Sequence, residues 1–186
     1  GATAANQWLL GTDAFGNKTQ NFYIYDASTA STRMFIDHLG NIGVGNYTFH
    51  PTNPEKFVVD AGNTSSYNVI SGKGTIDNYL HLNIQNKSNG TTASSDLVAT
   101  ADNGTETTNF VDLGINSSGY ASGGILGGIN NAYLYSTGND FMIGNATANK
   151  NLLFFTGGTN VSNERMRIDG TGKIAIATTS PGNFLE

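Results

Sequence analysis

The sequence predicts an all-β protein built from short strands. Gly, Asn, Thr and Ser together fill 45% of its 186 positions, and these residues are unfavourable in the interior of helices. Apolar side chains alternate with polar ones in short runs, which is the pattern of strands with one buried face. Gly-, Asn- and Asp-rich pairs separate nearly all of these runs, and such residues tolerate the positive φ angles of tight turns. Together the three observations exclude a helical bundle.

The clearest predicted strand is 79–86, where Leu80, Leu82 and Ile84 alternate with polar or aromatic residues. The same alternation, bounded by turn residues, predicts the remaining strands. These are 7–10, 21–25, 33–37, 41–44, 56–60, 96–101, 109–115, 132–136, 140–143, 151–155, 165–169 and 173–177.

One unit of the chain occurs twice. Residues 33–45, RMFIDHLGNIGVG, align with residues 165–177, RMRIDGTGKIAIA. Shorter matches around this core pair 8–11 with 141–144, 21–25 with 151–155, and Thr52-Asn53-Pro54 then Phe57 with Thr179-Ser180-Pro181 then Phe184. The repetition predicts three parts: a first repeat unit at 1–59, an inserted β-rich module at 60–135, and a second repeat unit at 136–186.

Each copy of the repeat is physically interpretable. The Arg-Met-x-Ile-Asp stretch is a strand that ends in an Asp, which starts a turn. The returning strand carries small residues at alternate positions, namely Gly43, Gly45, Ala175 and Ala177. Small side chains along one face allow another chain or sheet to approach closely.

Residues 163–181, NERMRIDGTGKIAIATTSP, resemble a module of bacteriophage tail fibres and tailspikes. In that family the module commonly lies upstream of a C-terminal intramolecular chaperone of the endosialidase type. The stretch 80–177, including 95–104 and 111–116, is also similar to such fibre proteins, although Ala175 and Ala177 replace the usual glycines. No chaperone follows Pro181, and Gly1 and Leu185-Glu186 look like cloning remnants, so we expect a fragment of a longer fibre.

The resemblance implies a homotrimer, with its chains side by side or intertwined along a three-fold axis as a β fibre segment. Within it we expect 60–135, which the repeat marks as an insert, to form a β-rich knob; a binding tip and further shaft are the open alternatives. It implies a structural, host-surface-binding and non-catalytic segment of a virion tail fibre. The partners would be a host cell-surface glycan or protein and other tail fibre segments. The low content of charged residues, 12%, is compatible with this, because charges buried near a three-fold axis meet copies of themselves.

Two other functions stay open: a polysaccharide depolymerase, as some tailspikes are, and a cellular adhesin or filament subunit. The net charge of −5 argues against nucleic acid as a partner. The sequence contains no apolar stretch of 18 residues, so it predicts no membrane insertion. The chain has no Cys, and its sequence predicts neither a cofactor nor a metal.

The candidate receptor-binding residues are Tyr120, Tyr133 and Tyr135, near the glycine-rich loop 123–128. Tyrosine offers flat, amphipathic contact area that suits glycans and proteins. The alternative is that these rings pack inside the trimer.

Other chemistry is weaker in the sequence. A glycosidase needs two carboxyl groups about 5–9.5 Å apart in a groove, and the candidates are Asp96, Asp102, Glu106, Asp112 and Asp140, against the alternative of turn-capping acids. The acidic glycine loop 102–106 resembles a calcium loop but reads better as a plain turn. The histidines His38, His50 and His81 lack the spacing of metal-chelating pairs. The alternative is a metal site on a three-fold axis, to which each chain contributes one histidine.

Overall fold

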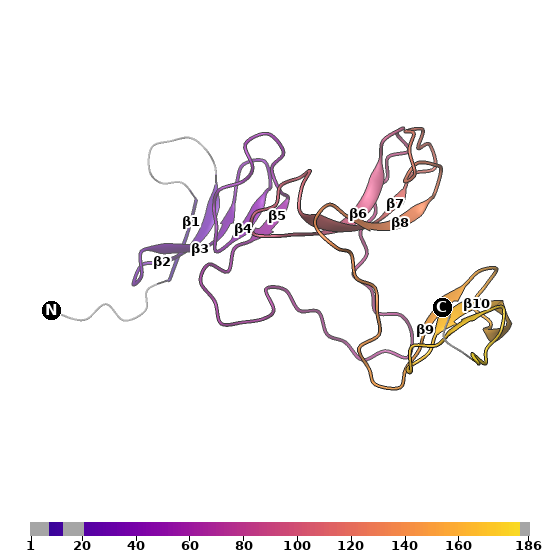
Figure 1. The fold of residues 1–186 in the computed structure, drawn as a ribbon. Coiled ribbons are helices and arrows are strands. Elements are labelled where there is room, and N and C mark those ends of the chain that lie inside the picture. Colours follow the sequence, from indigo (N-terminus) through magenta and orange to yellow (C-terminus); the bar gives the residue numbers. More distant parts are fainter. Residues whose placement is uncertain (1–7, 13–20, 183–186) are drawn as a thin grey trace. The chain divides into compact units, whose positions relative to one another are not determined.

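The computed structural model describes residues 8–12 and 21–182 and confirms the all-β prediction. Its strands form three sheets, and the only helix among the described residues is the single 3-10 turn η1, Val161–Asn163 (Figure 1). The chain divides into two compact units, Gly1–Leu80 and His81–Glu186. The first unit contains one sheet and the second contains two. The predicted division of the chain into three domains, at 59/60 and 135/136, stays a prediction.

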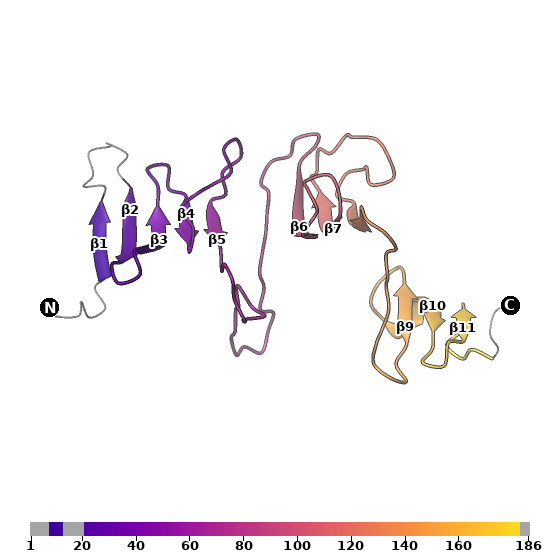
Figure 2. The same ribbon diagram turned by 60° about the vertical axis from the view of Figure 1, so that its left-hand side comes forward.

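The sheet of the first unit has five strands in sequential order (Figure 2). The first four are antiparallel, and β5 runs parallel to β4, with Ile42 opposite Phe57. The strands are β1 Trp8–Thr12, β2 Phe22–Asp26, β3 Ser31–Ile36, β4 Ile42–Val44 and β5 Phe57–Val59. Residues 45–56 form the longer connection that a parallel pair requires.

The second unit contains two three-stranded antiparallel sheets, in which each strand pairs with the next along the chain. The middle strand of each sheet is β7 or β10. The strands are β6 Ser94–Thr100, β7 Phe110–Asn116, β8 Ala132–Ser136, β9 Leu152–Phe155, β10 Glu164–Ile168 and β11 Ile174–Ile176.

The two copies of the repeat form the same hairpin with the same register. In the first copy Met34 lies opposite Val44 and Ile36 opposite Ile42. In the second copy the residues 132 positions later, Met166 with Ile176 and Ile168 with Ile174, pair in the same way. Sequence similarity between the copies is therefore matched by identical strand pairing.

The turn of each hairpin is built by the Asp that the repeat places at the end of its first strand. The Asp37 Oδ1 atom accepts hydrogen bonds from the backbone N–H groups of Leu39 and Asn41, at 2.8 Å each. Asp169 Oδ1 accepts the corresponding bonds from Thr171 and Lys173, at 2.8 and 3.0 Å. Side-chain caps of this kind fix a tight turn without help from a core.

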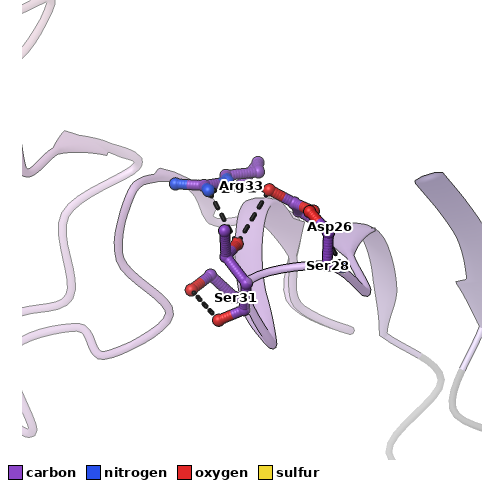
Figure 3. Close-up of polar contacts among 5 residues, drawn as sticks. Asp26, Ser28, Ser31 and Arg33 are labelled. Carbon is purple, nitrogen blue, oxygen red and sulfur yellow. Dashed lines mark hydrogen bonds and ion pairs between the residues drawn. The ribbon is translucent and has the colours of Figure 1, made fainter. Parts of the chain in front are cut away.

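The repeated arginine fastens the loop that precedes its strand. Arg33 and Arg165 both lie at a shift in strand register. Arg33 donates to Asp26 Oδ2 and Thr29 Oγ1, at 2.8 Å each (Figure 3). Arg165 instead donates to the Thr156 carbonyl and hydroxyl, at 3.2 Å each. The position is repeated, but its partners differ.

The small residues of the returning strand are partly used within the chain. A Cβ on Gly43 would overlap the carbonyl oxygen of Asn46, and one on Gly45 would overlap that of Asp60. Gly45 and Ala177, at equivalent positions, both adopt positive φ, at 72° and 58°. In the first copy these glycines thus make room for Asn46 and Asp60 of the same chain, and the approach of another chain or sheet stays a prediction.

Very little apolar surface is buried in the described residues. Ala175, which is 3% exposed, is their one fully buried hydrophobic residue. The other buried side chains are polar: Asp26, Asn41, Asp112 and Asn116. Within the described residues, each sheet thus holds its strands together with little buried apolar surface.

Two strand predictions were wrong. Residues 79–86 form no strand, and Leu80, Leu82 and Ile84 are exposed, because apolar alternation specifies a face but does not supply a partner strand. Residues 140–143 form none either. The same reason applies there, because no partner strand is present among the described residues, and the segment that follows makes only local side-chain bonds, from Asn145 to the backbone of Thr147 and Asn151 at 3.0 and 3.1 Å.

The remaining predicted strands are present, with ends shifted by a few residues. Some expectations concern residues outside the described ranges. These are the start of the first strand at Gln7, the repeat match at Phe184, and the terminal residues Gly1, Leu185 and Glu186.

Candidate functional site

The sheet β6–β8 has two chemically distinct faces, because neighbouring residues on a strand point to opposite sides. Cross-strand pairs define them, since residues opposite one another share a face. The polar face carries Ser94, Asp96, Val98, Thr100, Phe110, Asp112, Gly114, Asn116, Tyr133 and Tyr135. The apolar face carries Ser95, Leu97, Ala99, Val111, Leu113, Ile115, Ala132, Leu134 and Ser136.

Burial on this sheet is the reverse of the usual arrangement. On β7 the polar residues Asp112 and Asn116 are only 8% and 4% exposed, whereas Leu113 and Ile115 are about half exposed. Leu97, Leu113 and Leu134 form one cross-strand row, and each is close to half exposed. On the middle strand β7 the polar positions are therefore buried, while the apolar row across the three strands is left half exposed.

Asp96 is held on the polar face by two hydroxyl groups. The Tyr133 hydroxyl donates to Asp96 Oδ1 and the Ser94 hydroxyl donates to Oδ2, at 2.5 Å each. Tyr133 reaches across β7 to make this bond. It passes over Gly114, where a Cβ would overlap both the Tyr133 ring and Asp96 Oδ1. A glycine is therefore required between the two side chains.

Asp112 lies diagonally from Asp96 on the same face and is less fully supplied with donors. Its Oδ1 atom is buried and has no hydrogen-bond partner among the described residues. Burial, and next the negative charge of Asp96, raise the pKa of Asp112, and the Tyr135 hydroxyl offsets this only in part. The two carboxyl groups thus occupy different environments one strand apart.

Three aromatic rings follow one another along the same face. Phe110 and Tyr135 meet edge to face with their centroids 5.8 Å apart, and Tyr133 and Tyr135 are also 5.8 Å apart. Burial, followed by the bond to Asp96, raises the pKa of Tyr133 to about 12. Both tyrosines are therefore neutral hydroxyl donors at physiological pH.

A groove of about 570 Å³ opens over this face. Its size falls in the range of small-molecule sites. Its walls combine carboxylates, hydroxyls and two aromatic rings. The lining residues are Asp96, Val98, Thr100, Thr105, Glu106, Phe110, Asp112 and Tyr135.

The structure brings together only some of the residues singled out in the sequence. Asp96, Glu106 and Asp112 line the groove, whereas Asp102 and Asp140 do not. Tyr135 lines it and Tyr133 supports it through Asp96. The third receptor candidate, Tyr120, lies half-buried in the loop after β7, outside the groove.

The other candidate motifs have local structural roles. The loop 102–106 is part of the β6–β7 connection, where the Gly104 N–H bonds the Ala101 carbonyl at 2.9 Å. His50 accepts bonds from the Thr52 and Asn53 N–H groups through Nδ1, at 3.3 and 3.0 Å. Within the described ranges no group of three or more His, Asp or Glu side chains could hold a metal ion.

Sequence reasoning missed Asn116, which holds the glycine-rich loop 123–128. Its Nδ2 atom donates to the carbonyl groups of Leu126 and Gly128, at 2.8 and 3.1 Å. The sequence did contain a signal, because Asn116 is a polar residue at the last position of β7 and continues the alternation of that strand. The loop is thereby fixed to the polar face of the sheet.

Comparison with known proteins assigns no family: no family model matches the chain, and no curated protein matches it. In the part of the chain that the structure describes, no helix is long and apolar enough to cross a membrane.

Proposed function

We propose that this chain is a structural and host-surface-binding segment of a phage tail fibre, which acts as a homotrimer in the virion and does not catalyse a reaction. The observation that carries the proposal is the open apolar face of β6–β8, together with the near absence of buried apolar residues. The resemblance of residues 163–181 to the tail-fibre module supplies the trimer and the viral setting.

The energetic argument begins with the cost of ordering the chain. Fixing one residue's backbone costs roughly 1–2 kcal/mol, and full burial of a Leu or Ile side chain returns about 1.5–3 kcal/mol. Leu97, Leu113 and Leu134 are still about half exposed within one chain. Covering them would supply stabilisation that a single chain does not obtain.

A second copy of the same chain suits this face. It carries Leu, Ile, Val, Ala and Ser but no charged side chain. Identical copies can therefore meet there without bringing like charges together, which would be costly in a buried interface. An extended, uncharged face is otherwise a liability in a soluble protein.

Light scattering coupled to size-exclusion chromatography tests the assembly. The expected mass is about three times 19.6 kDa. A well-folded monomer of 19.6 kDa would contradict the proposal. Host binding is tested by incubating the fluorescently labelled protein with a panel of bacterial strains, and the expected result is selective labelling of a few strains.

One observation favours a second candidate, the polysaccharide depolymerase. Asp96 and Asp112 share a groove, and the pKa of Asp112 is raised while Asp96 keeps two donors. Glycosidases use such contrasting environments to keep one carboxyl group protonated, as the acid, and the other ionised, as the base or nucleophile. The assay for new reducing ends on capsular polysaccharide distinguishes the two functions. The adhesin or filament alternative is distinguished by neighbouring genes, since tail and baseplate genes favour the phage.

A further inference from the structure

The groove on the polar face contains more negative charge than its own residues compensate. Three carboxylates line it, those of Asp96, Glu106 and Asp112, and none of its lining residues is a lysine or arginine. Asp96 has two neutral donors. Asp112 is 92% buried, and its Oδ1 atom has no partner in the described part of the chain. The Tyr135 hydroxyl supports Asp112 only in part, and a buried carboxylate oxygen without a donor is costly.

We propose that this groove binds a protonated amine carried on a saccharide, that is, an amino sugar without its N-acetyl group. The inference rests on the proposed host-surface function and names the chemistry of the ligand. An ammonium group brings a positive charge, which no lining residue of the groove carries, and three N–H donors in addition to the hydroxyls already present. A neutral sugar would supply hydroxyl donors but leave the charge uncompensated, and an anionic sugar would add to the repulsion.

The walls of the groove suit the rest of such a ligand. Phe110 and Tyr135 present neighbouring rings against which the apolar face of a pyranose can pack. The hydroxyls of Thr100 and Thr105 line the same space and can bond sugar hydroxyls. A bare metal ion is a poorer match, because the described residues supply no group of three suitable ligands.

The groove also stays available in the proposed assembly of this sheet. It opens on the polar face, whereas the face we assign to other copies of the chain is the opposite, apolar one. Self-association through the leucine row would therefore leave the carboxylates open to a ligand.

The test is isothermal titration calorimetry of the assembled protein with two matched probes, a hexamer of glucosamine and a hexamer of N-acetylglucosamine. The backbones are the same, and only the first carries protonated amines. We expect the glucosamine hexamer to bind roughly tenfold more tightly, as a charge-assisted hydrogen bond implies. Asp112→Asn should remove most of this preference. Asp140→Asn, which removes the same charge from an exposed site outside the groove, should leave it intact.

Several results would overturn the inference. Equal binding of both hexamers would exclude recognition of the amine. An equal loss in Asp112→Asn and Asp140→Asn would mean general attraction by a negative protein. Tighter binding of a hexalysine peptide than of the glucosamine hexamer would assign the groove to a protein ligand. These outcomes are distinguishable from failure of the proposed function, because the mass from light scattering reports the trimer independently.

Discussion

The repeated hairpins and the sheet β6–β8 are ordered by different kinds of interaction. Each hairpin is fixed locally, by an Asp that caps its own turn and an arginine that fastens the loop before it. The sheet β6–β8 is fixed by contacts across strands, between Asp96, Tyr133 and Gly114, and its apolar face is open. The difference indicates that the turns of the hairpins are fixed within the chain, whereas the apolar face of β6–β8 is left for the partner copies proposed above.

The largest expected effect is on the open face of the sheet. Leu113→Asp places a charge in the centre of the leucine row, where desolvation costs several kcal/mol per ion. We expect the assembly to dissociate and the mass from light scattering to fall to about 19.6 kDa. Ile125→Asp is the matched control, because Ile125 is 99% exposed in a loop. Retention of the trimer by Leu113→Asp would place the interface elsewhere.

A second substitution pair compares equivalent positions of the two hairpins. Gly43→Ala should lower the free energy of unfolding by about 1–3 kcal/mol, because its Cβ overlaps the Asn46 carbonyl. Ala175→Gly, at the same register position, should cost only about 0.5–1 kcal/mol from added backbone freedom. Urea unfolding of the two variants measures both. Equal losses would show that the segment after β4 adjusts around the added methyl group.

The two carboxyl groups of the polar face should respond in opposite directions. Asp112→Asn removes a buried charge whose Oδ1 atom has no partner among the described residues, and it should raise the free energy of unfolding by about 1–2 kcal/mol. Asp96→Asn leaves the Tyr133 and Ser94 hydroxyls with a poorer acceptor and should lower it by a similar amount. Chemical denaturation of both variants tests the contrast, and destabilisation by both would mean that the Tyr135 hydroxyl outweighs the cost of burying Asp112.

Much of the fold follows from the sequence because its rules are local. Alternation on 109–115 predicts β7, and the shared RMxID stretch predicts two like hairpins, whose turns the aspartates specify within four residues. The failures at 79–86 and 140–143 arise because alternation contains no information about a partner strand. Part of the site could be predicted because Tyr133, Tyr135 and Asp112 have side chains whose chemistry is recognisable without knowing their neighbours. The roles of Gly114 and Asn116 depend on residues from other strands or loops.

The smallest expected effect is a difference in how the two regions respond to pH. The Thr171 hydroxyl holds the pKa of Asp169 below its usual value. Burial opposes this effect, and the Lys173 and Thr171 N–H groups add to it, so this turn is stabilised while the carboxylate is ionised. Its stabilisation is complete above the unfolded-state pKa of about 3.9 and is lost as the pH falls below it.

Asp112 has the opposite sign. Its raised pKa means that the folded sheet binds the proton more tightly than the unfolded chain, so acidification from pH 7 towards about 4 stabilises β6–β8. Hydrogen exchange, corrected for intrinsic rates, should therefore slow in 110–116 over this range, while 164–176 stays unchanged and loses protection only below about pH 4. Parallel behaviour of the two regions would mean that they unfold as one unit. In Asp112→Asn the gain in 110–116 should disappear, because the group that binds the proton is absent and the turn at Asp169 is untouched.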